Sequence, residues 1–220
     1  MFADKILKFY ENLSLPVNLP GEIKVLAPFK DPVTFELMCS YYKKFYSSLY
    51  ERTAIFGINP GRFGAGLTGI MFTDPVSLEE NCGIKNTLPK RKELSSEFIY
   101  DVIDGFGGKI VFSEKFYLGA VCPVGFTKNG VNYNFYDDKT TAKLLEGFII
   151  EAVRAQIECG CSKERCILLG TGKNAAYFND LNSREKFFKV VAAIEHPRFI
   201  MQYKRKQKDE FVDKYLQLLG

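Results

Sequence analysis

The sequence predicts an α/β fold in which a parallel β-sheet is covered by helices on both faces. Two observations support this prediction. Short apolar runs that stop at glycine, proline or asparagine alternate along the chain with longer segments of helical periodicity. Parallel strands need such crossover helices, which then cover both faces of their sheet. A chain of 220 residues that is 46% hydrophobic can bury one sizeable core, so we expect a single domain over residues 1–220.

The N-terminal residues 1–50 are expected to form a helical and extended arm packed on this domain. Residues 3–13 show the amphipathic pattern of a short helix. The next segment, LPVNLPGEIKVLAPFKDP, holds four prolines and predicts an extended path over the surface. Asp31 or Thr34 can then open a helix that runs to about residue 47.

The middle of the chain predicts two strands separated by a helix. Residues 53–58, TAIFGI, read as a buried strand that is stopped by Asn-Pro-Gly. Residues 93–106 predict a helix that ends at the following Gly-Gly pair. A second strand is expected at 116–121, before a proline.

The C-terminal half continues the alternation. Residues 140–159 form the clearest helical pattern, and residues 165–169 predict a third strand that ends in Gly-Thr-Gly. A short helix is expected near 173–178, a fourth strand at 189–194 and a last helix at 209–219. Because the carboxyl ends of parallel strands open into one crevice, loops distant in sequence are expected to meet there.

Composition excludes several classes of protein. No uninterrupted apolar run is long enough to cross a membrane, and the N-terminus lacks the pattern of a signal peptide. Six irregularly spaced cysteines predict reduced thiols in a cytoplasmic protein. Three of them, Cys159, Cys161 and Cys166, are clustered, but an iron–sulfur cluster needs four thiolates. We therefore expect no metal and no cofactor, and we infer no obligate protein partner.

Positive charge is concentrated near the C-terminus. Residues 184–208 carry eight Lys or Arg and two Glu, a local charge of +6 within a chain whose net charge is +4. Such a patch is typical of a protein that binds a phosphate-rich partner, although a solvated surface gives the same pattern.

The stretch FGINPGRFGAGLTGIMF, residues 56–72, holds five glycines directly after the first predicted strand. One interpretation is a phosphate cradle, but neither the G-x-x-x-x-G-K-[ST] nor the G-x-G-x-x-G fingerprint is present. The other interpretation is a rigid site for a flat ligand. Asn59 follows the strand, Phe72 can lie over a ring, and the last strand delivers His196, the one histidine of the chain.

These residues resemble a known family. Residues 57–61, Gly-Ile-Asn-Pro-Gly, together with Thr68-Gly69 and Phe72, resemble the first motif of the uracil-DNA glycosylase superfamily, in the branch with Asn in place of Asp. His196-Pro197 is similar to the second motif of the single-strand-selective monofunctional uracil-DNA glycosylases, as are ELSSEF and Val-Cys-Pro elsewhere. The resemblance spans about residues 53–205. It implies a three-layer α/β/α sandwich around a short four-stranded parallel sheet.

The resemblance also implies a DNA repair enzyme of base excision. Such an enzyme flips uracil or a related damaged base out of single- or double-stranded DNA and hydrolyses its N-glycosidic bond without cutting the strand. The catalytic residues would be Asn59, which orients the attacking water, and His196, which donates a hydrogen bond to the departing base. The glycines would let the backbone approach the flipped nucleotide and its phosphates.

The base-binding residues are expected to be Ile58, Phe72, Asn132 and Asn134. The family carries an asparagine before the Leu-Cys-Pro segment that reads the base, and Ala120 stands there in this chain. Either of the two asparagines could supply the missing amide, although Asn-Gly also favours a turn.

Residues 197–206 are expected to form a loop that enters the duplex, with Arg198, Phe199 and Ile200 as wedges. The residues expected to contact DNA are Arg62, Pro197, Arg198, Phe199, Lys204, Arg205 and Lys206. The run Lys90-Arg91-Lys92 could also hold phosphates.

Two alternative functions stay open on the sequence alone. A protein of the same fold that lacks the base reader could bind nucleic acid without catalysis. A cytosolic enzyme could instead bind a nucleotide through the glycine-rich segment.

Overall fold

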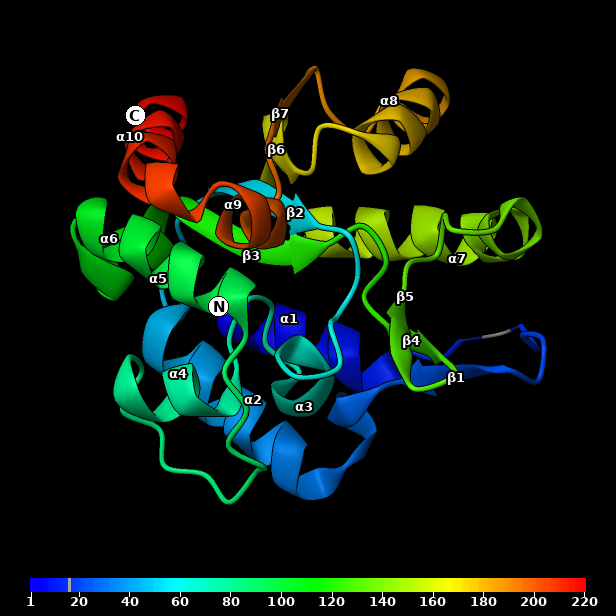
Figure 1. Ribbon diagram of the computed structural model, residues 1–220, viewed down its shortest axis with the longest axis horizontal. Coiled ribbons are helices and arrows are strands. Elements are labelled where there is room, and N and C mark those ends of the chain that lie inside the picture. The colour runs from blue at the N-terminus through cyan, green and yellow to red at the C-terminus, as the bar shows by residue number, and fades with distance from the viewer. Residues whose placement is uncertain (16) are drawn as a thin grey trace.

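A computed structural model describes residues 1–15 and 17–220 of the chain. Its centre is a four-stranded sheet with the order β3-β2-β6-β7, in which every pairing is parallel (Figure 1). The strands are β2 (Arg52–Gly57), β3 (Phe116–Ala120), β6 (Cys161–Leu169) and β7 (Val190–Ile194). Helices flank this sheet, which confirms the predicted fold class.

The structure has several longer helices, and most of them lie where the sequence predicts a helix. They are α1 (Phe2–Asn12), α2 (Pro32–Phe45), α5 (Leu94–Gly105), α6 (Gly108–Lys115), α7 (Lys139–Glu158), α8 (Lys173–Glu185) and α10 (Lys208–Leu219). In Figure 1, α5, α6 and α10 gather at the left of the sheet and α7 and α8 at its right. The unpredicted helix α6 begins at the glycine pair that was expected only to end α5, because Gly107 turns the chain with φ of +111°.

A second, antiparallel sheet was not predicted. It has the order β1-β4-β5 and consists of β1 (Ile23–Leu26), β4 (Gly125–Lys128) and β5 (Val131–Tyr133). Asn129 and Gly130 join β4 to β5 with positive φ at both positions, as a two-residue hairpin requires. Part of the expected extended arm is therefore an edge strand, while Pro16 of that arm lies outside the described residues.

The N-terminal helix is fixed to the sheet through a buried arginine. Arg52, at the start of β2, is 0% exposed and donates hydrogen bonds to the carbonyl oxygens of Ser113 and Tyr50. Its guanidinium lies 4.6 Å from the ring centroid of Phe2 in α1. These contacts satisfy a buried cation that has no acidic partner among the residues described.

Three further helices are short: α3 (Ala65–Thr68), α4 (Pro75–Glu80) and α9 (Pro197–Tyr203). The expectation of a loop at 197–206 is wrong, since His196 caps α9 by accepting a hydrogen bond from the Arg198 N–H and Pro197 occupies the first helical position. None of the helices in the described part of the chain combines the length and the apolarity that a membrane span needs.

Candidate active site

A cavity of about 570 Å³ opens where β2 and β7 end. Such a volume is in the range of small-molecule and nucleotide sites. The side chains that line it come from the glycine-rich segment, the start of α5, strand β5 and helix α9. They are Ile58, Asn59, Gly61, Arg62, Phe63, Ala65, Met71, Phe72, Lys92, Glu93, Leu94, Ser95, Val131, Asn132, Asn134, His196, Arg198, Phe199, Gln202 and Tyr203. The parallel sheet thus brings Asn59 and His196 into one cavity.

Asn59 presents a free carbonyl oxygen. Its amide nitrogen lies 3.4 Å from the Tyr133 carbonyl oxygen and 3.5 Å from that of Pro60, and both neighbours can only accept. The NH₂ group must therefore face them. The Oδ1 atom is buried and has no hydrogen-bond partner in the described part of the protein. A buried acceptor left open in this way favours a donor that arrives with a ligand or with water.

His196 is held as a neutral hydrogen-bond donor. Its Nδ1 accepts the backbone N–H of Arg198 at 3.1 Å, so in the neutral ring the proton lies on Nε2. Burial lowers the pKa of His196 to about 4, and the positive charge of Arg198 adds to that shift. At neutral pH the side chain can therefore donate one hydrogen bond from Nε2 without carrying a charge.

Phe72 forms a fixed wall beside His196. Its ring is buried, and the ring centroids of Phe72 and His196 lie 6.0 Å apart at an interplanar angle of 47°. The backbone at Phe72 has φ of +55°, which is unusual for an aromatic residue. A methyl group on Gly57 would lie 2.7 Å from the ring, so this position needs glycine.

The predicted base-binding residues line the cavity, but some of their polar groups already form hydrogen bonds within the protein. Asn132 Oδ1 accepts the backbone N–H of Arg62 at 2.9 Å, which ties β5 to the glycine-rich segment and leaves the Asn132 NH₂ group for other contacts. Asn134 hydrogen-bonds to Asp137 through its backbone and its side chain, as in a turn. Ile58 lines the cavity, while its carbonyl oxygen accepts the N–H of Cys122.

Ala120 does not reach the cavity. It is 0% exposed at the end of β3, and its carbonyl oxygen accepts a hydrogen bond of 3.0 Å from Gln156 Nε2. The position that carries the family's base-reading asparagine is therefore closed in this chain.

The most unusual side chain of the cavity is Glu93, the first residue of the ELSSEF segment, for which the sequence predicted no role in the site. Its carboxyl group occupies the space beside two glycines of the glycine-rich segment. A methyl group added at Gly61 would lie 2.6 Å from Glu93 Oε1, and one added at Gly64 would lie 1.7 Å from Glu93 Oε2. Burial raises the pKa of Glu93 to about 7, against the opposing charge of Arg198 and with a further contribution from Asp74. At Gly61 and Gly64 the missing side chains thus accommodate a carboxyl group of the protein, and the approach of these glycines to a nucleotide stays an expectation.

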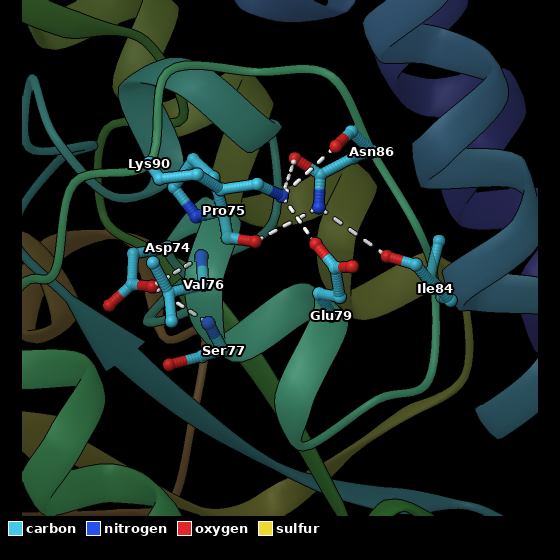
Figure 2. A network of polar contacts seen from close by, with 8 residues as sticks. All are labelled: Asp74, Pro75, Val76, Ser77, Glu79, Ile84, Asn86 and Lys90. Atoms are coloured by element: carbon cyan, nitrogen blue, oxygen red, sulfur yellow. Dashed lines mark hydrogen bonds and ion pairs between the residues drawn. The ribbon is translucent and has the colours of Figure 1, made fainter.

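A polar network fixes the segment that leads to Glu93 (Figure 2). Asp74 caps α4 by accepting the N–H groups of Val76 and Ser77 at 2.9 and 2.8 Å. Its second oxygen accepts the Glu93 N–H at 2.8 Å. Lys90 donates to Glu79 Oε2 at 2.5 Å and to Asn86, so in this structure Lys90 helps to hold the loop between α4 and α5.

The residues expected at the DNA interface separate into three groups. Arg62, Arg198 and Phe199 line the cavity, and Phe199 is 43% exposed. Lys204, Arg205 and Lys206 are exposed beyond α9, where Arg205 forms an ion pair of 3.1 Å with Glu97. Pro197 and Ile200 are buried, and the expectation that Ile200 is a wedge is wrong because it faces the core. Two exposed aromatic side chains at the cavity, Phe63 and Tyr203, were missed.

The clustered cysteines are buried thiols. Burial raises the pKa of Cys159 to about 12 and shifts the pKa values of Cys161 and Cys166 upward as well. Thiols of this kind stay protonated at neutral pH.

Comparison with known proteins shows the family of this chain. A family model described as the uracil DNA glycosylase superfamily matches residues 44–220. The crystal structure of wild-type SMUG2 from Pedobacter heparinus is similar to this chain, with a TM-score of 0.95 and 44% sequence identity over 99% of this chain and 96% of that one. A comparison with curated proteins gives no match. The chain belongs to the uracil DNA glycosylase superfamily.

Proposed function

We propose that this protein is a monofunctional uracil-DNA glycosylase, which flips uracil or a closely related base out of DNA and hydrolyses its N-glycosidic bond without strand cleavage. The observation that carries the proposal is the convergence of the Asn59 amide and the His196 imidazole on one cavity walled by Phe72. Family membership and the similarity to SMUG2 support the same activity.

His196 would stabilise the departing base. When the C1′–N bond breaks, its electron pair stays on the base, and negative charge spreads onto the ring carbonyl oxygens. A neutral Nε2–H donor in a partly buried site stabilises that charge and needs no protonation beforehand. This suits a leaving group that departs as an anion.

Asn59 would orient the attacking water. Its open Oδ1 can accept a hydrogen bond from water, while the Tyr133 and Pro60 carbonyl oxygens fix the orientation of the amide. An amide is not a base, so this residue positions the water and does not take its proton. The Phe72 ring would stack on the flipped base.

The rim of the cavity would bind the DNA strand. Arg62 and Arg198 lie at the cavity, and Lys204 and Lys206 are exposed at the end of α9 with no ion partner in the described structure. The exposed ring of Phe199 is suited to the space that the flipped base leaves. Side chains of this kind bind DNA largely through its phosphates and stack on its bases.

A base-release assay tests the proposal. Oligonucleotides with one uracil, single-stranded or paired, are incubated with the wild type, His196→Ala or Asn59→Ala, and abasic sites are then cut with hot alkali. We expect cleavage by the wild type only after alkali, and a loss of about 10²–10³ in rate for each variant, as for loss of a single oxyanion donor. Gln207→Ala, in the exposed turn after α9, is the control and should keep the wild-type rate.

The alternatives give different results. Salt-dependent binding of the oligonucleotide without base release would indicate a non-catalytic nucleic-acid-binding protein. Affinity for mononucleotides without either activity would indicate a nucleotide-binding enzyme. Strand cuts before alkali would contradict the monofunctional reaction.

A further inference from the structure

Glu93 lines the cavity that also holds Asn59 and His196. Its carboxyl group fills the space beside Gly61 and Gly64, two and five residues after Asn59. The main positive charge that acts on the Glu93 carboxyl group is that of Arg198 in α9, two residues after His196.

Strand β5 borders both the Glu93 carboxyl group and the Asn59 amide. A methyl group added at Gly61 would lie 2.6 Å from Glu93 Oε1 and 3.6 Å from Asn132 Nδ2, so these two side chains border the same space. The next residue, Tyr133, contributes the carbonyl oxygen that faces the Asn59 amide at 3.4 Å. Asn132 therefore lies near the Glu93 carboxyl group, and the next residue, Tyr133, lies beside the Asn59 amide. Both groups are thus found along strand β5.

The carboxyl oxygens of Glu93 have no bonding partner within residues 1–15 and 17–220. In that part of the chain neither oxygen forms a hydrogen bond or an ion pair, although the backbone N–H of Glu93 is fixed by Asp74. The charged groups around it are Asp74 at the start of α4, Arg198 of α9, and Lys92 and Arg62 at the cavity. A carboxyl group that lines the cavity and is not engaged by the described protein is free to act on a ligand, which points to a role in the reaction.

Resting on the proposed function, we propose that Glu93 is a catalytic residue whose carboxylate accepts the proton of the attacking water. In this step the water oxygen bonds to C1′ of the flipped nucleotide, and the C1′–N bond breaks with its electron pair remaining on the base. The proton that the water loses moves to Glu93, which later releases it to solvent. Neither Asn59 nor His196 can do this, because an amide is not a base and the Nδ1 lone pair of His196 is engaged by Arg198.

The ionisation of Glu93 fits this role. Its pKa of about 7 allows it to be a carboxylate at neutral pH and still to hold a proton transiently. His196, with a pKa of about 4, stays neutral throughout the range in which Glu93 titrates. A change in rate near pH 7 can therefore be assigned to Glu93.

Single-turnover base release, measured from about pH 5.5 to about pH 9, tests the proposal. The wild-type rate should rise about tenfold per pH unit below about pH 7 and level off above it. Glu93→Gln, which keeps the shape of the side chain, should be slower by about 10²–10⁴ at high pH and should lack the rising limb. Glu36→Gln changes an exposed carboxylate of α2 that forms no ion pair in the described structure, and it should behave as the wild type.

A second variant separates catalysis from structure. Glu93→Ala leaves a space between Gly61 and Gly64 into which formate fits, and added formate should restore part of its rate. Thermal unfolding and binding of an oligonucleotide with an uncleavable abasic analogue show whether the variants still fold and bind. Glu93→Gln at the wild-type rate, a slow variant that keeps the rising limb, or folded Glu93→Ala without rescue would each overturn the proposal. If the wild type releases no base at all, the proposed function itself fails first.

Discussion

At the scale of single residues, the glycine-rich segment is adapted to side chains of this protein. Gly57 leaves room for the Phe72 ring, and Gly61 and Gly64 leave room for the Glu93 carboxyl group. At Gly57 the close approach is to the buried Phe72 ring, so packing requires glycine there. At Gly61 and Gly64 it is to the end of the Glu93 side chain, which would have to move if a Cβ atom were added. The segment thereby places an aromatic wall and a carboxyl group beside Asn59.

Gly64→Ala should displace the Glu93 carboxyl group. Its methyl group would lie 1.7 Å from Glu93 Oε2, so the carboxyl group must move. Because that oxygen ends a flexible side chain, we expect a loss of no more than about 1 kcal/mol in the free energy of unfolding, the lower limit for overpacking, together with slower base release. Chemical denaturation measures the first effect.

Gly147→Ala is the matched control. Gly147 lies within α7, and no atom lies within 4 Å of the added methyl group. It should raise the free energy of unfolding by about 0.5–1 kcal/mol and leave base release unchanged. Equal effects of both substitutions would contradict the packing argument.

At the scale of elements, the active site depends on how short helices begin. His196 caps α9 with the same Nδ1 atom that fixes its tautomer, so formation of the helix and orientation of the imidazole are one event. Asp74 likewise caps α4 with one carboxylate oxygen and holds the Glu93 backbone with the other. The two helix starts therefore orient the groups that would act on the base and on the water.

Asp74→Ala should affect both stability and activity. Loss of the cap should lower the free energy of unfolding by about 0.5–2 kcal/mol. Because the Glu93 N–H loses its acceptor as well, base release should slow by more than the unfolded fraction explains. Denaturation curves and single-turnover rates on the same samples measure the two effects.

Asp138→Ala provides the comparison for this prediction. Asp138 caps α7 through the Thr141 N–H at 2.9 Å and does not line the cavity. A similar loss of stability with an unchanged rate is expected. A rate equally reduced in both variants would show that Asp74 has no special connection to the site.

At the scale of the whole molecule, two exposed lysines without an ion pair in the described structure, Lys204 and Lys206, follow α9 at the end of the strands where the cavity opens. Lys163 lies near the beginning of β6, at the opposite end of the parallel strands. Phosphate binding by the first two lysines would orient a DNA strand across the cavity.

The dependence of DNA binding on salt tests this arrangement. Replacing Lys204 and Lys206 by Ala should reduce the slope of log K against log salt by about 0.7–0.9 for each phosphate that the variant no longer binds. Lys163→Ala should leave the slope as it is in the wild type. Fluorescence anisotropy with an uncleavable abasic analogue measures both, and equal slopes in all proteins would rule out these lysines as phosphate ligands.

Much of the fold could be predicted because its signals are local. Apolar runs bounded by glycine and proline marked β2, β3, β6 and β7, and helical periodicity marked the long helices. The second sheet escaped prediction because β1 pairs with β4 across about a hundred residues of sequence, and no local pattern records such a pairing. Helix α9 was missed although His-Pro is a valid helix start, because the basic residues after it resemble a binding loop.

The sequence by itself determined the four strands of the parallel sheet, most of the longer helices, the family motifs and the two polar residues that follow β2 and β7, since each of these depends on neighbouring residues. Only the tertiary structure decided which side chains surround those motifs. It brought Glu93 into the space beside Gly61 and Gly64, engaged Asn132 with Arg62, closed Ala120 inside the sheet and buried Ile200. The physical reason is that burial, charge and hydrogen-bond partners arise from segments far apart in the chain, and they set the chemistry of a side chain as much as its identity does.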